Sequence, residues 1–97
     1  MAVDKAGFQV FLHAIGDRGV RMALDAYAAA EAANGKKDRR PRIEHIETSR
    51  AEDWPLFKSL GVIASMQPLH ANPDQNNFNV WSHNAGPDRA SRAWAWR

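Results

Sequence analysis

Two stretches decide the fold of this chain: F-Q-V-F-L-H, from Phe8 to His13, and R-I-E-H-I-E, from Arg42 to Glu47. Each is a short run rich in apolar side chains, and each carries a histidine, His13 in the first and His45 in the second. Short runs rich in β-branched and aromatic residues are typical of buried strands. Each stretch therefore predicts a strand that closes at a histidine. The predicted bounds are Phe8–Leu12 and Arg42–Ile46.

A helix-length segment separates these two strands. Asp17 is a good N-cap residue, apolar side chains recur at helical spacing over residues 18–33, and Gly35 can end a helix. The segment therefore predicts a helix from about residue 18 to residue 33. Strand, helix and strand then form one β-α-β unit.

A second helix is expected before the third strand. Ser49 with Glu52 three residues later fits a capping box, whereas Pro55 favours either a first-turn proline or a helix that restarts near Trp54. Gly61 ends this helix in either case.

The third strand is predicted at Val62–Met66, followed by a loop at Asn72–Asn79 and a helix start within Arg89–Arg97. This alternation indicates α/β architecture, with three parallel strands and right-handed crossover helices. Neighbouring parallel strands end side by side, about 4.8 Å apart. His13 and His45 could therefore both reach one metal ion.

Composition narrows the class of protein. A chain of 97 residues is at most one small domain, and only part of a larger α/β fold. Its hydrophobic content of 44% is ordinary for a globular protein. No cysteine is present, so histidine and carboxylate side chains are the plausible ligands for a transition metal.

Charge and hydropathy give expectations about partners and location. Thirteen Lys and Arg against eleven Asp and Glu give a net charge of only +2, so we expect no nucleic-acid partner and no membrane partner. The basic run at Lys36–Arg42 lacks interleaved aromatic residues and precedes a strand, which predicts a solvated loop opposite any active site. No signal-peptide pattern and no apolar run of about 18 residues occur, so we expect a cytoplasmic protein.

Three motifs carry a resemblance to a known family. They are H-A-I-G-D at His13–Asp17, R-I-E-H-I-E at Arg42–Glu47, and V-I-A-S-M-Q-P-L-H-A at Val62–Ala71. Together they resemble the amidohydrolase family 3 branch of the metal-dependent amidohydrolase superfamily, the YtcJ-like hydrolases. The tail G-P-D-R-A-S-R-A-W-A-W-R, from Gly86 to Arg97, resembles the family's segment before its eighth strand. The likeness runs over nearly the whole chain.

The resemblance implies a partial TIM (β/α)8 barrel, with residues 1–97 as its fifth to seventh strands and catalytic groups at the carboxyl ends of strands. It implies that His13 and His45 are metal ligands for a divalent ion, with zinc expected. His70 and Gln67 would bind a small-molecule substrate. The implied reaction is hydrolysis of a non-peptide C–N bond by a metal-activated water.

The chain also departs from the family's pattern. The family's full site uses an H-x-H pair on its first strand, a bridging residue on its fourth and an aspartate on its eighth. His83 has no H-x-H partner and is expected to be a solvated loop residue, and Asp74 and Asp88 lie in the wrong segments. We therefore expect a truncated piece that is inactive alone, and assign no catalytic residue. The alternative is a non-catalytic α/β fragment that self-associates through exposed sheet edges or binds a partner.

Structural roles compete with these chemical ones. Strand-end histidines such as His13 and His45 also occur as hydrogen-bonded core residues, and a loop histidine such as His70 is often a surface residue. Gln67 and Ser65 share a strand face, where they could line a pocket or hydrogen-bond within the barrel.

Other polar and aromatic residues receive structural roles. Asp17 is most simply a helix N-cap. Glu44 alternates away from His45 along the strand, which predicts a packing or ion-pair role on the opposite face. Trp94 and Trp96 would pack a helix face against the complete barrel and could be left exposed in this chain.

Overall fold

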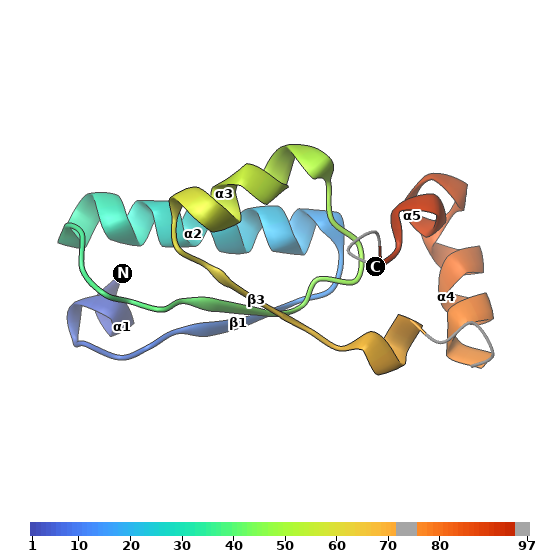
Figure 1. Ribbon diagram of the computed structural model, residues 1–97, viewed down its shortest axis with the longest axis horizontal. Helices are drawn as coiled ribbons and strands as arrows, with labels where there is room; N and C mark the ends of the chain where they lie inside the picture. The colour runs from blue at the N-terminus through green and yellow to red at the C-terminus, as the bar shows by residue number, and fades with distance from the viewer. Residues whose placement is uncertain (72–75, 95–97) are drawn as a thin grey trace.

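Three parallel strands form one sheet in the order of the sequence. The computed structural model describes residues 1–71 and 76–94. β1 (Phe11–Ala14) pairs with β2 (Arg42–His45), and β2 pairs with β3 (Ile63–Met66). The predicted α/β architecture is confirmed: three parallel strands are joined by segments that carry helices (Figure 1).

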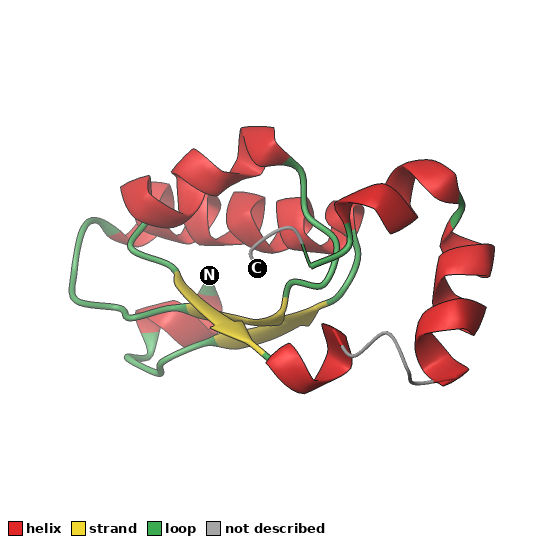
Figure 2. Cartoon of the chain, turned by 45° about the vertical axis from the view of Figure 1, so that its right-hand side comes forward, coloured by secondary structure: helices red, strands yellow, loops and turns green. Residues whose placement is uncertain are grey.

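Helices lie on one face of this sheet, at the amino ends of its strands and beyond its carboxyl edge. They are α1 (Ala2–Lys5), α2 (Asp17–Asn34), α3 (Trp54–Ser59), α4 (Asn76–Ala85) and α5 (Pro87–Arg92), with 3-10 turns η1 (Ala51–Asp53) and η2 (Pro68–Ala71). α2 and α3 lie on the same face, and η2, α4 and α5 lie past the ends of the strands (Figure 1 and Figure 2). Within the described residues, no helix has the length and apolar character needed to cross a membrane.

The first strand begins later than the sequence predicts. The expected strand was Phe8–Leu12, but the ladder starts at Phe11, which pairs with Arg42. Arg40, two residues before β2 begins, has a left-handed backbone with φ +46° and so leaves the extended conformation. The Val10 carbonyl accepts the N–H of Arg42 at 3.1 Å, and before Val10 the ladder does not continue.

The start of α3 decides between two sequence interpretations. The helix begins at Trp54 with Pro55 in its first turn, so the restart near Trp54 is confirmed. The capping box is wrong, because the Ser49 hydroxyl accepts a hydrogen bond from Trp54 Nε1 at 2.9 Å. The Ser49 hydroxyl thus accepts its hydrogen bond from a tryptophan side chain rather than from the backbone amides of a helix.

The last third of the chain is more helical than predicted. The expected loop at Asn72–Asn79 ends early, because α4 begins at Asn76; residues 72–75 lie outside the described residues. His83 is exposed as predicted, but it lies in this helix rather than in a loop.

The expected helix within Arg89–Arg97 begins earlier, as α5, with Pro87 in its first turn. Trp94 is buried against Trp81, with ring centroids 5.4 Å apart, so its expected exposure is wrong. Trp96 lies outside the described residues.

The core lies between the sheet and α2. The helix buries Val20, Leu24 and Tyr27 at helical spacing, as predicted, against Ile43 of β2 and neighbouring apolar side chains. Gly35 ends the helix with φ +76°, a conformation that glycine adopts without steric cost, and its N–H donates to Glu31 O at 2.9 Å. This core fixes α2 over β1 and β2.

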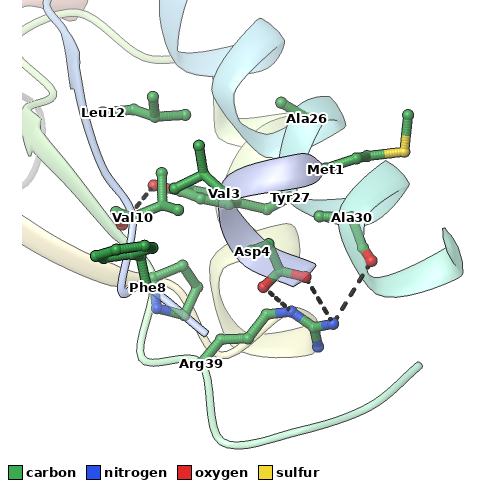
Figure 3. A pocket seen from close by; sticks show the side chains of 11 residues that line it. Met1, Val3, Asp4, Phe8, Val10, Leu12, Ala26, Tyr27, Ala30 and Arg39 are labelled. Carbon is green, nitrogen blue, oxygen red and sulfur yellow. Dashed lines mark hydrogen bonds and ion pairs between the residues drawn. The ribbon is translucent and has the colours of Figure 1, made fainter. Parts of the chain in front are cut away.

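At the amino ends of the strands, α1 flanks a cavity of about 210 Å³ (Figure 3). The buried Asp4 carboxylate accepts hydrogen bonds from Arg39 Nε at 2.8 Å and from Asn34 Nδ2 at 2.7 Å. These contacts, the one with Arg39 above all, lower the pKa of Asp4 to about 2. The basic loop therefore lies at the end away from the histidines, as predicted, but the Arg39 side chain is only 9% exposed and forms an ion pair rather than being solvated.

Tyr27 gives the first stability prediction. Its hydroxyl donates to Arg42 O at 2.6 Å and lies 3.0 Å from Val10 O, linking α2 to both strands, and burial raises its pKa to about 12. Tyr27→Phe keeps the ring and removes the hydroxyl, so we expect a loss of about 1 kcal/mol in the free energy of unfolding. Urea denaturation measures it, and an unchanged midpoint would show that the hydroxyl contributes nothing.

Asp4 gives a prediction for acid stability. Because its folded-state pKa of about 2 lies below the ordinary value of 3.8, its contribution to stability is complete above a pH of about 4 and is lost as the pH falls through about 2. In Asp4→Asn, the thermal midpoint should therefore depend less steeply on pH across this window than in the parent chain. Asp25→Asn, on the exposed side of α2, is the matched control. Equal slopes in the parent chain and Asp4→Asn would contradict this assignment.

Candidate metal centre

Three histidines gather where the strands end. His13 in β1 and His45 at the end of β2 have ring centroids 4.0 Å apart in an edge-to-face contact. His70 in η2, just past β3, stacks on His45 with a centroid distance of 5.5 Å and an interplanar angle of 15°. Side chains from three consecutive strand ends thus form one cluster.

The backbone at the end of β2 explains how His45 reaches His13. His45 and Ile46 have φ of +79° and +56°, a conformation that costs a residue with a side chain on the order of 1–3 kcal/mol. Ile43 and Ile46 both lie in the core, three positions apart, whereas strict alternation would send His45 there. The left-handed turn therefore puts Ile46 into the core and leaves the His45 ring against His13.

Glu44 has the ion-pair role that the sequence predicts. Its carboxylate lies 2.8 Å from Arg42 Nη2. The hydrogen bond from Ser65 is the largest cause that lowers its pKa, followed by the charge of Arg42, with His45 a further contributor. The expected placement of Glu44 and His45 on opposite faces is wrong at this point, because the left-handed backbone of His45 interrupts the alternation.

Sequence reasoning missed Glu47. Its Oε1 lies 2.5 Å from Nδ1 of His70 and 3.7 Å from Nδ1 of His45. One ligand atom from each of His45, Glu47 and His70 lies within 4.8 Å of the others, close enough to hold one metal ion. The available signal was its position two residues after His45 in R-I-E-H-I-E.

The donors in this cluster fit a divalent metal. Imidazole nitrogen and carboxylate oxygen are ligands that zinc and similar ions take in proteins. Nδ1 of His45 is buried and has no hydrogen-bond partner among the described residues. Because this nitrogen lies 3.7 Å from Oε1 of Glu47, the other ring nitrogen of His45, Nε2, is the one available to an ion.

The predicted substrate contacts lie beside the cluster. Gln67 is exposed at the end of β3, and its backbone carbonyl accepts the N–H of His70 at 3.0 Å. Ser65 accepts a hydrogen bond from Arg42 at 2.9 Å. Of the two roles expected for Ser65, pocket lining or hydrogen bonding within the barrel, this contact is the second. Substrate binding by Gln67 and His70 stays a prediction.

Asp17 has a structural role, though not as the cap itself. Gly16 is the N-cap, and Asp17 is the first helical residue, whose carboxylate accepts the N–H of Arg18 at 2.9 Å. Burial would raise the pKa of Asp17, but this bond and those from arginines outweigh it and lower the pKa. The arginines within 3.5 Å are Arg50, Arg89 and Arg92. Asp17 therefore ties α5 to the strand ends.

The chain resembles the crystal structure of an uncharacterized metal-dependent hydrolase from Pyrococcus furiosus, with a TM-score of 0.63 and 33% identity, over 94% of this chain and 17% of that one. It is 46% identical over 77 residues to Protein LONG AFTER FAR-RED 3 of Arabidopsis thaliana, over 79% of this chain and 13% of that protein.

The chain spans less than a fifth of the length of either relative. The model of the amidohydrolase family matches the chain over residues 1–97, including the strand-end histidines. The chain therefore belongs to the amidohydrolase family.

Proposed function

We propose that this chain is part of a metal-dependent amidohydrolase that hydrolyses carbon–nitrogen bonds other than peptide bonds. The observation that carries the proposal is the contact of His13 and His45, with ring centroids 4.0 Å apart, at the ends of adjacent parallel strands. In (β/α)8 barrels the catalytic groups sit at this end of the strands. The uncharacterized metal-dependent hydrolase from Pyrococcus furiosus, similar in sequence and in fold, supports the coarser part of the proposal, a metal-dependent hydrolase.

In this proposal His13 and His45 hold a divalent ion, for which zinc is our choice because imidazole and carboxylate, the ligand types that the chain offers, are common zinc ligands. The chemistry that such an ion supplies when bound is polarisation of a carbonyl and activation of a water molecule. Substrate binding would be the task of side chains. His70, 40% exposed, and Gln67 would contact a small-molecule substrate at the same strand ends.

Other expectations about the whole protein remain predictions. They are a cytoplasmic location and the absence of nucleic-acid and membrane partners. The reaction itself requires groups beyond those of this chain, since the family's first-strand and eighth-strand ligands have no counterpart in its sequence.

Metal binding is the direct test of the site. Titration of the chain with Zn²⁺ in a calorimeter should show one weak site, because two histidines hold zinc less firmly than the usual three or four ligands. His13→Ala and His45→Ala should each weaken binding at least about tenfold. His83→Ala, at an exposed histidine of α4, is the matched control and should leave affinity unchanged. Equal affinity in all three variants would place the ligands elsewhere.

A second candidate function has its own observation. Phe8, Phe11 and Ile63 are 69%, 55% and 44% exposed, and β1 and β3 are the outer strands of the described sheet. Exposed apolar side chains beside unpaired strand edges favour association. The alternative is therefore a non-catalytic α/β piece that self-associates through its sheet edges.

Sedimentation velocity tests this alternative. The sedimentation coefficient of the chain should rise with protein concentration, because edge strands pair with copies of themselves. Ile63→Lys places a charge on the β3 edge and should remove the rise. Met22→Lys, at a 60% exposed position of α2, is the matched control and should preserve it. A coefficient independent of concentration in the parent chain would exclude self-association.

A further inference from the structure

Glu47 faces two of the three histidines. Its Oε1 lies 2.5 Å from Nδ1 of His70 and 3.7 Å from Nδ1 of His45. The two rings are parallel within 15°, with centroids 5.5 Å apart. The Glu47 side chain is only 10% exposed, against 40% for His70. A carboxylate withdrawn from solvent therefore approaches the same ring nitrogen, Nδ1, of both histidines.

The backbone that carries Glu47 is held on several sides. The Glu47 carbonyl accepts the N–H of Trp94 at 2.6 Å, and the next residue, Thr48, donates its N–H to Ile15 O at 2.9 Å. The preceding residue, Ile46, is 2% exposed in the core. Because its neighbours fix this segment, the carboxylate has a set position. The histidine rings must orient to it, rather than the reverse.

The chemistry of the groups then determines where the ring hydrogens lie. A carboxylate accepts hydrogen bonds but does not donate them, so a ring nitrogen that faces it closely carries a hydrogen. A neutral imidazole has one N–H, and its other nitrogen keeps a lone pair. His70 meets this condition at 2.5 Å. His45, at 3.7 Å, is beyond hydrogen-bond distance but is drawn to the same form by the same negative charge.

We propose that Glu47 is a positioning residue that fixes both His45 and His70 as Nδ1–H tautomers, so that each ring keeps its Nε2 lone pair for the site. The inference rests on the proposed function, in which the Nε2 lone pair of His45 serves the metal. It extends that function to substrate, because Nε2 of His70 then accepts a hydrogen bond from a substrate N–H or O–H. Metal-ligating histidines commonly donate their second N–H to a carboxylate, which fixes tautomer and orientation. Here a single carboxylate serves two rings.

The tautomers are measurable without metal or substrate. Long-range ¹H–¹⁵N correlation spectra of the ¹⁵N-labelled, metal-free chain at pH 8, above the ordinary histidine range, report which ring nitrogen carries the hydrogen. We expect Nδ1–H at His45 and His70. Glu47→Gln removes the charge and introduces an amide that also donates, so both rings should shift toward the Nε2–H form that an unconstrained histidine side chain prefers. Glu52→Gln, the same change at an exposed glutamate, is the matched control and should alter neither ring.

Zinc titration of the same variants adds a second readout. Glu47→Gln should weaken zinc affinity about 10–100-fold, the effect typical of losing an outer partner of a ligand, while Glu52→Gln should leave it unchanged. Tautomers that stay the same in Glu47→Gln would overturn the inference, whether or not the chain binds zinc. Tautomers that shift in a chain without zinc binding would uphold it and overturn the proposed metal site instead. If Glu47→Gln loses its fold, the parent spectrum decides, since an Nε2–H form at either ring contradicts the proposal.

Discussion

The left-handed backbone at His45 and Ile46 is the constraint on which the candidate site depends. Burial of Ile46 in the core holds this unfavourable conformation in place, and the conformation in turn frees the His45 ring to meet His13. Packing of Ile46 in the core on one face of the sheet thus orients the His45 ring at the carboxyl ends of the strands. The same segment continues directly into Glu47, so the core also fixes the position of the carboxylate.

A second set of contacts joins the strand ends to the last helices. Asp17 lies close to three arginines, two of which belong to α5, and the backbones of Thr48 and Ala93 form an isolated bridge. Because Trp94 also donates to the Glu47 carbonyl, the segment after α5 contacts the residue that approaches His70. The region around the carboxyl ends of the strands is therefore built from the middle and the end of the chain together.

Much of this arrangement could be predicted from local pattern, and the remainder depends on tertiary contacts. Apolar periodicity gave α2, and strand-end histidines gave the meeting of His13 with His45, because parallel topology fixes where strand ends lie. The local pattern could not predict that Glu47 belongs to the cluster, since the approach of Glu47 to His70 depends on the path of the chain after β3. Nor could alternation predict the orientation of the His45 ring, because nothing in the local sequence signals positive φ at His45 and at the β-branched Ile46.

At position 45 the requirement for folding stability and the requirement for an imidazole side chain favour different residues. Glycine adopts a φ of +79° without steric cost, whereas histidine does not, so this position would fold more readily without the side chain that the proposed site requires. A chain with histidine there gives up part of its folding free energy to hold an imidazole at the strand end. Selection for thermal stability alone would therefore act against the site, and a stabilised variant with glycine at this position would be the one that has lost its chemistry.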